Sequence, residues 1–504
     1  MKLKKFVKKI FEGKKDQKVR FSAHENRIID YIPTACHFDE HSLITKNGDI
    51  MQIIKIRGFE DNDSKFLSES LRTRVRNALN AHINQPDLFV YLHTIRERAD
   101  ISPKGDFNVE FAAELDKLWT LKNNWDRQLV NTLYITIVKR RDNISFIDKT
   151  IFIDSILKNR TKNYFTAASA ELKEICNNLI ADLQRFDASP LKVVKKSDGY
   201  YSEPISFINY LVNSTQEQFK MREENIGETL SDSDISYQFN SIRIKQAVED
   251  RYLAVFTIKE MHNISEKIFD NLLQTGTQFI ITEAYHLTDY ETATAKYNLK
   301  AEQLRDLGKS KMLESSGLDE IVDDSNIKDK KELSHCKNYM TISVFSDDKD
   351  FFQQKLEVFT RILQDIGLVV IREDFYMASA FWAQIPGNMR YLKRGQYLPR
   401  SRIANFAAIH HRKMGSYVGS KWGPPITIFR ALDGNPYFFN FHTGNDGNTF
   451  FIGSEQSGRT TLCRFFLSQS MKLEPKVIYI DTEGTSENFT KEMKGKYYKC
   501  DFES

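Results

Sequence analysis

The segment of the chain with the clearest chemical potential is a glycine-rich run near residue 455. Residues Gly453 to Thr460 read GSEQSGRT and fit the pattern G-x-x-x-x-G-K-[ST], except that Arg459 takes the place of lysine. Glycines in such a loop let backbone N–H groups curl around phosphate oxygens, and a hydroxyl at the position of Thr460 ligates Mg²⁺. The sequence therefore predicts a site for a nucleotide polyphosphate, with Mg²⁺ beside Thr460.

Nine consecutive residues make up this predicted phosphate-binding site: Gly453, Ser454, Glu455, Gln456, Ser457, Gly458, Arg459, Thr460 and Thr461. Arginine is a longer, planar cation, so its exchange for the compact lysine is not conservative. Backbone donors are expected to bind phosphate without the lysine. Hydrolysis, which depends on charge placed at the γ-phosphoryl group, is in question. The alternative is a glycine turn in an ordinary α/β unit.

The elements around the loop are predicted to form a β-α-β unit. The apolar run Thr449–Ile452 predicts a strand before the loop, Thr461–Met471 a helix after it, and Lys476–Ile480 a second buried strand. Asp481 and Glu483 follow that strand at once, which is too early for the acidic strand that assists hydrolysis. Only 44 residues follow Thr460. We therefore expect an incomplete nucleotide-binding domain with no water-activating acid and no arginine finger.

The remaining chain has a mixed α/β pattern without an evident internal repeat or low-complexity linker. Residues 194–203 are expected to form a loop, and 289–325 a charged helical excursion. A helix is predicted where Leu67, Leu71, Val75 and Leu79 recur every four residues, and another at Asp348–Leu363. Runs rich in β-branched and aromatic residues predict strands at Ser42–Thr45, Met51–Ile56, Phe89–Thr94, Leu133–Val138, Tyr339–Phe345, Gly367–Glu373, Ile426–Phe429 and Tyr437–Phe441.

Composition excludes several classes of protein. The 504 residues carry a net charge of +4 and are 41% hydrophobic, which excludes a disordered chain and gives no sign of a nucleic-acid-binding surface. Five scattered cysteines indicate a reducing compartment rather than a disulfide framework. No apolar run is long enough to span a membrane. Met1–Arg20 contains eight lysines, one arginine and two acids, so it is either a basic amphipathic helix on an anionic membrane or a solvated terminus.

Other candidate residues have an ordinary structural alternative. His37, Glu40 and His41 match the letters of an inverted zinc-protease motif, but nearby Pro33 favours a turn over the helix that the motif needs. The histidines His410, His411 and His442 show no metal spacing, and Cys463 is expected to be a small buried residue. We expect four aromatic residues in the core, with adenine contact as the alternative for one near the loop: Trp382, Trp422, Phe438 and Phe439.

An ordered set of motifs around the loop resembles a known family. The motifs are FWAQIPGN at Phe381–Asn388, NFA from Asn405, WGPPITIF at Trp422–Phe429, GNPYFFNFH at Gly434–His442 and the loop itself, with YIP from Tyr31 and TKNGDIMQIIK at Thr45–Lys55 upstream. This order is similar to that of the TrbE/CagE-type ATPases of bacterial type IV secretion systems, the fourth component of the VirB machinery. The resemblance runs from about Asn26 to the end of the chain.

The resemblance implies a RecA-like motor domain behind a family-specific N-terminal half. Its domains would be a basic tail (1–20), an N-terminal α+β domain (21–195), a second family region (196–395) and the truncated start of the motor (396–504). It implies ATP and Mg²⁺ as cofactors at Gly453–Thr460, and the chain departs from the family at Arg459. The implied location is peripheral, on the cytoplasmic face of the inner membrane. Implied partners are other secretion subunits, further copies of the chain or a full-length paralogue.

Three functions follow as expectations. The first is a motor subunit that binds ATP and energises pilus assembly and export, with weakened or lost turnover. The second is a non-catalytic scaffold that docks to membrane partners through its N-terminal half. The third, a pump that moves DNA, is disfavoured by the modest net charge. ATP binding without hydrolysis would favour the scaffold, and turnover that rises on oligomerisation would favour the motor.

Overall fold

The computed structural model describes residues 28–56, 67–99, 101–102, 105–125, 128–141, 159–222, 226–230, 233–246, 250–261, 272, 276–306, 333–349, 352–404, 407, 415, 419–430, 436–442, 446–454 and 456–499. The chain forms two compact units. The first unit comprises Met1–Gly58, Lys65–Arg96 and Asn131–His410. The second unit comprises Phe59–Ser64, Glu97–Val130 and His411–Ser504. The basic tail expected at Met1–Arg20 lies outside the described residues.

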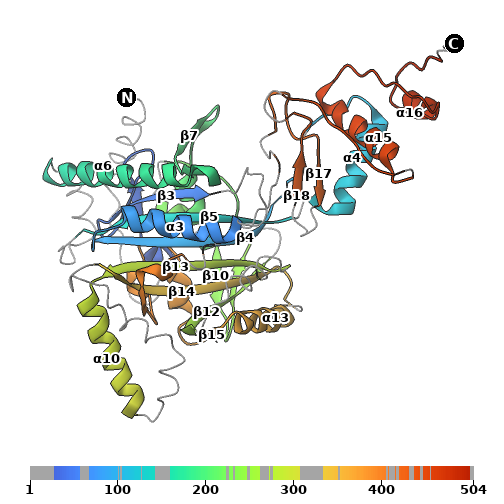
Figure 1. The fold of residues 1–504 in the computed structure, drawn as a ribbon. Coiled ribbons are helices and arrows are strands. Elements are labelled where there is room, and N and C mark those ends of the chain that lie inside the picture. The colour runs from blue at the N-terminus through green and yellow to red at the C-terminus, as the bar shows by residue number, and fades with distance from the viewer. Residues whose placement is uncertain are drawn as a thin grey trace. The chain divides into compact units, whose positions relative to one another are not determined.

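One mixed-length sheet of 13 strands organises the first unit (Figure 1). Its strand order is β1-β2-β3-β5-β4-β13-β14-β12-β11-β10, with β6 beside β3, β15 beside β12 and β16 beside β14. The strands are β1 (Thr34–His37), β2 (Leu43–Thr45), β3 (Ile50–Ile56), β4 (Leu88–Ala99), β5 (Gln128–Lys139), β6 (Ala188–Pro190), β10 (Asp234–Tyr237), β11 (Ile242–Lys245), β12 (Arg251–Met261), β13 (Gln278–Thr288), β14 (His335–Ser346), β15 (Leu368–Arg372) and β16 (Gln396–Pro399).

The sheet is buried on both faces. Along β13, Ile280 and Ala284 join one hydrophobic cluster, whereas Phe279 and Ile281 join another. Because successive side chains of a strand point to opposite faces, the two clusters lie on opposite sides of the sheet. Covered faces explain why the β-branched runs of the sequence predicted these strands correctly, and the mixed α/β class is confirmed.

The two halves of this sheet repeat one topology. Each half begins with three strands that pair in the order of the chain. An inner strand follows, and after a connection containing a helix the next strand pairs between the inner strand and the third strand. Each half ends with a helix and a short strand that pairs with the third strand. In this order β1, β2, β3, β4, α4, β5, α6 and β6 correspond to β10, β11, β12, β13, α10, β14, α13 and β15. The inner strands β4 and β13 pair antiparallel and join the halves. The sequence shows no evident internal repeat, and the duplication lies in the order of strand pairing.

Helices cover the sheet where apolar residues recur at helical spacing. In α13 (Phe352–Asp365), the buried side chains Phe352, Leu356, Phe359 and Leu363 follow the three-to-four residue period. The other helices of the first unit are α2 (Ile28–Tyr31), α3 (Leu67–His82), α6 (Asn159–Asp182), η2 (Gln184–Phe186), α7 (Glu203–Asn213), α8 (Ile226–Thr229), α10 (Tyr290–Asp306), α14 (Met377–Ala383), η3 (Met389–Tyr391) and η4 (Arg400–Arg402).

Two segments of the first unit, residues 194–203 and 289–325, were expected to form a loop and a charged helix. Residues 194–203, expected as a loop, contain the hairpin strands β7 (Val193–Lys196) and β8 (Gly199–Ser202), to which β9 (Phe219–Lys220) adds. The hairpin is short and mostly half-buried, and its residues do not alternate between apolar and polar, so no strand pattern reveals it. The helical excursion expected at 289–325 is confirmed as α10 up to Asp306, and residues 307–332 lie outside the described part.

The second unit is smaller and less regular. Its elements are α4 (Glu110–Asn123), the hairpin strands β17 (Thr427–Arg430) and β18 (Pro436–Phe439), α15 (Arg459–Ser470), η5 (Met471–Leu473) and α16 (Glu487–Glu492). A small core joins Ile101 and Trp125 to Ile428 and Phe438. Segments near residues 100 and 430 thus build one unit, although more than 300 residues separate them.

Candidate nucleotide-binding site

The glycine-rich loop ends at the first turn of α15. Gly458 has φ +84°, in the left-handed region where glycine is favoured, and Gln456 also has a positive φ of 62°. The backbone N–H of Leu462 donates to the carbonyl of Gly458 at 2.9 Å, which begins the helix. The loop therefore delivers the chain to the N-terminus of a 12-residue helix, where N–H groups lack partners within the helix.

The start of the loop folds back on its own end. A Cβ atom on Gly453 would lie 2.5 Å from Ser457 Oγ and 3.4 Å from Arg459 Cγ, so a side chain at this position would collide with the loop. The N–H of Ser457 donates to the carbonyl of Ser454 at 3.3 Å, which makes the intervening turn. A glycine-containing loop that leads into a helix N-terminus suits an anionic phosphate group. The residues present therefore fit the phosphates of a nucleotide.

The side chains of the loop are accessible. Ser454, Gln456, Ser457, Gly458 and Arg459 are exposed. Thr461 is exposed as well, and Thr460 is half-buried, while Glu455 lies outside the described residues. Thr460 offers one hydroxyl for Mg²⁺, and the described residues include no group of three or more His, Cys, Asp or Glu placed to hold a metal ion. A cation here would be held chiefly by the nucleotide and by water.

Asp481, beyond α15, accepts hydrogen bonds from backbone N–H groups of its own turn. Its carboxylate accepts the N–H of Glu483 at 3.0 Å and that of Ser486 at 2.8 Å, just before α16 begins. The hydrogen bond from the Ser486 side chain is the largest effect that lowers the pKa of the Asp481 carboxyl. Arg464 of α15 donates to Thr485 Oγ1 at 2.7 Å. The turn is thus tied to the helix that follows the loop.

Aromatic packing holds α15 in place beneath the loop. The Phe466 ring lies 4.3 Å from that of Phe439, 5.4 Å from Phe429 and 5.3 Å from Phe451, centroid to centroid. Phe451 belongs to the segment that enters the loop. Phe466 therefore links that segment and the hairpin β17–β18 to the helix.

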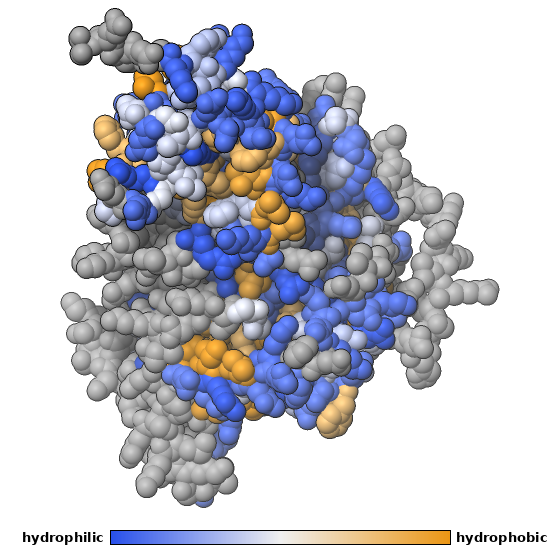
Figure 2. All heavy atoms as spheres, turned by 90° about the vertical axis from the view of Figure 1, so that its right-hand side faces the viewer, coloured by the Kyte–Doolittle hydropathy of each residue, from blue (hydrophilic) through white to orange (hydrophobic). Residues whose placement is uncertain are grey.

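The β-α-β prediction around the loop was half right. The helix is confirmed, but the segments Thr449–Ile452 and Lys476–Ile480 have extended backbone without strand pairing. Phe450, Ile452 and Ile478 are 89%, 94% and 92% exposed, so the second predicted strand is not buried. Figure 2 shows hydrophobic residues (orange) at the surface of the molecule. A strand of this composition is stable when neighbours cover it, and the described residues supply none.

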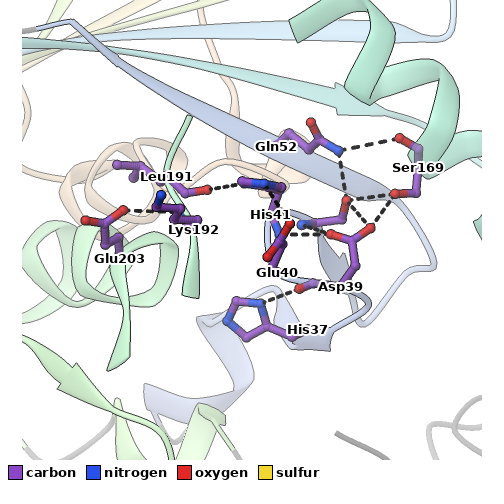
Figure 3. Close-up of polar contacts among 10 residues, drawn as sticks. His37, Asp39, Glu40, His41, Gln52, Ser169, Leu191, Lys192 and Glu203 are labelled. Carbon is purple, nitrogen blue, oxygen red and sulfur yellow. Dashed lines mark hydrogen bonds and ion pairs between the residues drawn. The ribbon is translucent and has the colours of Figure 1, made fainter. Parts of the chain in front are cut away.

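The candidate zinc motif forms a polar turn between β1 and β2 (Figure 3). Asp39 accepts the N–H groups of His41 at 2.9 Å and Ser42 at 2.7 Å, and the Ser169 hydroxyl also donates to it. His41 Nδ1 lies 3.1 Å from the carbonyl of Leu191, to which it donates. Glu40 pairs with the same ring at 3.3 Å. The side chains hold neighbouring segments together, so the structural alternative is the correct one.

His37 illustrates this structural use. Its Nδ1 lies 3.2 Å from the carbonyl of Asp39 and its Nε2 lies 2.8 Å from Ser202 Oγ. A carbonyl only accepts, so Nδ1 carries the proton and Nε2 accepts from the hydroxyl. Burial lowers the pKa of His37 to about 4, which keeps the ring neutral. Ser202 in turn caps α7 by accepting the N–H of Ile205.

The remaining candidates divide between core and surface. Trp382 and Phe438 are buried as expected, and Phe439 and Cys463 are half-buried. The expectation for Trp422 was wrong, because it is 59% exposed and stacks on the His442 ring at 4.8 Å. His410 and His411 lie outside the described residues.

The family motif at Phe381–Asn388 is structural and belongs to the first unit. Trp382 stacks on Tyr31 with 4.8 Å between ring centroids, and Asn388 donates to the carbonyl of Tyr31 at 2.8 Å. His93 Nε2 lies 2.7 Å from the carbonyl of Gln384. These contacts fasten α14 to segments of the N-terminal half, including the YIP motif at Tyr31.

Sequence reasoning missed one contributor to the site region, the helix α4. Its residue Trp119 donates its indole N–H to the carbonyl of Ile428 at 2.9 Å, and its ring lies 4.9 Å from that of Phe465 on α15. The helix sequence is rich in charged residues, and nothing local to it indicates an association with residues near 428 and 465.

Comparisons with known proteins agree with this architecture. Residues 189–394 match the model of the CagE, TrbE, VirB family, described as a component of the type IV transporter system. Residues 41–144 match the N-terminal domain of the type IV secretion system ATPase VirB4/TrbE. The two matched segments contribute the two repeating halves of the large sheet.

Curated relatives match nearly the whole chain. The type IV secretion system protein virB4 of Bartonella quintana is 26% identical over 477 residues, which is 93% of this chain and 60% of the relative. The protein of the same name from Brucella melitensis is 23% identical, over 89% of this chain and 56% of the relative. The protein virB4 of Agrobacterium fabrum is 21% identical, over 93% and 59%. The chain spans about three-fifths of the length of these relatives. Together the two family models and the relatives show that the chain belongs to the CagE, TrbE, VirB family of type IV transporter components.

Proposed function

We propose that this chain is the ATP-binding component of a type IV secretion system, with the nucleotide held at Gly453–Thr461. The observation that carries the proposal is the loop in which Gly453 folds back on Ser457 and which leads into the N-terminus of α15. Backbone N–H groups would bind the phosphates, and Thr460 would contact Mg²⁺. When bound, ATP with Mg²⁺ supplies the phosphoryl group whose transfer energises pilus assembly and substrate export.

Arg459 sets the expected strength of this activity. The Arg459 guanidinium is exposed at the start of α15, where it adds positive charge to the helix N-terminus. It lacks the compact ammonium geometry of lysine, so we propose nucleotide binding with weak turnover. Asp481 already accepts two backbone N–H groups of its own turn, and these hydrogen bonds make its carboxylate a weak base for activating water.

The second unit is proposed to be the beginning of a RecA-like domain. Phe450, Ile452, Ile478 and Ile480 form two bare stretches of apolar side chain beside α15. A further polypeptide segment, continuous with this chain or separate from it, would pair with these stretches and cover them. The extra length of the curated relatives supports this reading.

We further propose a peripheral position at the cytoplasmic face of the inner membrane, beside other secretion subunits. No helix among the described residues is long and apolar enough to cross a bilayer. The basic segment Met1–Arg20 would bind anionic lipid, each charge adding on the order of 1 kcal/mol. Association with further copies or with a full-length paralogue would supply missing motor elements.

The test is a titration of a fluorescent ATP analogue with Mg²⁺ against three proteins. The chain is compared with Gly458→Val, which places a β-branched residue at φ +84°, and with the control Gly276→Val, where a Cβ meets no atom within 4 Å. We expect binding by the wild type and the control and at least about tenfold weaker binding by Gly458→Val. Equal binding by all three proteins, or none at millimolar nucleotide, would remove the proposal.

The scaffold function is distinguished by a second measurement, the binding of secretion partners with and without ATP. The first unit has a sheet buried on both faces and needs no nucleotide to be stable. A scaffold would therefore bind its secretion partners equally well with and without ATP. Binding to partners that depends on nucleotide would favour the motor component.

A further inference from the structure

The helix α4 belongs to the second unit, but its segment is inserted between two strands of the sheet of the first unit. It lies between β4 and β5, which are neighbours in that sheet, and residues Glu97–Val130 group with the C-terminal residues rather than with the sheet. The last residues of β4 and the first residues of β5 belong to this insertion. The insertion is therefore joined at both ends to strands of the first unit.

Trp119 is the main contact of α4 with the nucleotide-loop helix. Its ring packs against Phe465 of α15 at 4.9 Å and against Phe429 of β17 at 5.9 Å, and its indole N–H donates to the carbonyl of Ile428. An aromatic residue that packs its ring and satisfies its one donor is held in a single orientation. Trp119 thus fixes the position of α15 relative to the hairpin β17–β18.

A second set of contacts lies at the other end of α15. Lys472, in η5 directly after the helix, is only 8% exposed, and its aliphatic chain lies so close to Gly105 that a Cβ there would approach within 2.8 Å. Burial lowers the pKa of Lys472 to about 8, and the nearby charge of Asp116 on α4 offsets part of this effect. Asn108 donates to Glu474 beyond η5. The insertion therefore contacts α15 at Phe465 and the residues directly after its end.

The corresponding helix of the other half of the sheet behaves differently. The connection between β13 and β14 contains α10, which packs against β14 and β16 in its own unit, with Tyr290 and His335 ring centroids 5.5 Å apart. Two connections in equivalent places of the repeat thus have different partners. Covering the sheet does not explain α4.

We propose that the insertion carrying α4 positions the nucleotide loop, and that Trp119 and Asp116 are positioning residues for the nucleotide site through α15. The inference rests on the proposed nucleotide binding. Because the loop begins where α15 begins, a shift of this helix displaces the N–H groups that face the phosphates. The same contacts connect nucleotide binding to β4 and β5, whose ends form the insertion.

The experiment measures the affinity of the full chain for a fluorescent ATP analogue with Mg²⁺. The variants are Trp119→Ala, Trp119→Phe and Asp116→Asn, and the matched control on the same helix is Leu118→Ala, whose side chain is 58% exposed. We expect at least about tenfold weaker binding for Trp119→Ala, a few-fold loss for Trp119→Phe and Asp116→Asn, and wild-type affinity for Leu118→Ala. Trp119→Phe keeps the test valid if Trp119→Ala fails to fold.

Amide hydrogen exchange supplies a readout that a purely structural role would not change. We expect nucleotide to slow exchange in residues 110–123 of the wild type, and Trp119→Phe to reduce that protection while its exchange without nucleotide stays unchanged. Protection of residues 456–462 with no change in 110–123, together with equal affinity of Trp119→Phe and Leu118→Ala, would overturn the inference. Absence of binding and of protection at residues 456–462 in the wild type would instead remove the proposed function on which it rests.

Discussion

The two units of this chain obtain their stability in different ways. In the first unit, long strands pair with neighbours on each side and both faces of the sheet are covered. In the second unit, one hairpin packs on α15 in a small aromatic core around Phe466, α4 joins it through Trp119, and apolar segments beside it are bare. The predicted nucleotide loop therefore belongs to the unit that we expect to be the less stable of the two.

The small core of the second unit and its exposed apolar segments have a functional consequence. Elements that bind ligands and change conformation are drawn from the less stable parts of a protein. Nucleotide, the insertion carrying α4 and a covering polypeptide would each add contacts to the second unit. The first unit provides a platform that none of these events needs to alter.

Hydrogen exchange is expected to show the largest contrast between the units. Amides of Ile281–Tyr285 in the centre of the sheet pair with β4 and β14, whereas Lys476–Ile480 belongs to no helix or strand. We expect exchange in the sheet to be at least about a thousandfold slower than in Lys476–Ile480. Peptide-level mass spectrometry measures both in one sample, and comparable protection would mean that Lys476–Ile480 is paired in solution.

One core substitution in each unit tests whether the two units unfold independently. Phe466→Ala is expected to cost the second unit about 3 kcal/mol, because its ring contacts five other aromatic rings. The first unit should be unaffected. Phe279→Ala, at a fully buried position of the sheet, should do the reverse. Denaturant unfolding followed by thiol labelling separates the units, since Cys463 reports on the second and the buried Cys176 on the first. One shared transition that both variants shift would contradict the division.

The first unit should depend on pH through Glu283. Burial raises the pKa of this carboxyl from 4.5 to about 8, and the Tyr285 hydroxyl donates to it. The folded state therefore keeps a proton that the unfolded state loses above pH 4.5, so this group lowers stability as the pH rises from 4.5 to 8. Glu283→Gln should remove that decline, measured as the Cys176 labelling midpoint at pH 5 and pH 8. The exposed control Glu357→Gln should keep it, and an unchanged slope in Glu283→Gln would refute the assignment.

The smallest expected effect concerns Arg459. Arg459→Lys should tighten binding of the ATP analogue a few-fold, because a compact ammonium reaches the phosphates more directly. It should not restore rapid turnover, since Asp481 stays hydrogen-bonded to the backbone of its own turn. Steady-state phosphate release measures turnover. Fast hydrolysis by this single variant would show that the described loop region has more of the catalytic apparatus than we infer.

The strands of the first unit could be predicted because each is apolar enough to be read locally. Runs such as Met51–Ile56 and Tyr339–Phe345 are buried by their neighbours, as their composition requires. The repeat was missed because it resides in the order of pairing, which the two halves share without a visible likeness in sequence. Pairing partners such as β4 and β13 are almost 200 residues apart.

Predictions for the second unit were less complete for a physical reason. Gly453 and Gly458 indicated the loop because glycine chemistry is local, and the helix after it followed. Thr449–Ile452 and Lys476–Ile480 have the composition of buried strands, but burial requires neighbours that the described residues do not provide. Trp119 could not be assigned, since its partners near residues 428 and 465 are brought to it only by the fold.

Thiol labelling of the full chain in denaturant, with and without ATP and Mg²⁺, tests whether the second unit is the less stable one and whether it binds the nucleotide. Ligand that binds only the folded second unit stabilises it by about 2.7 kcal/mol at a hundred times the dissociation constant. We predict that Cys463 becomes reactive at a lower denaturant concentration than Cys176, and that nucleotide raises the Cys463 midpoint alone. Coincident midpoints that do not move with saturating nucleotide, or a shift confined to Cys176, would contradict the account.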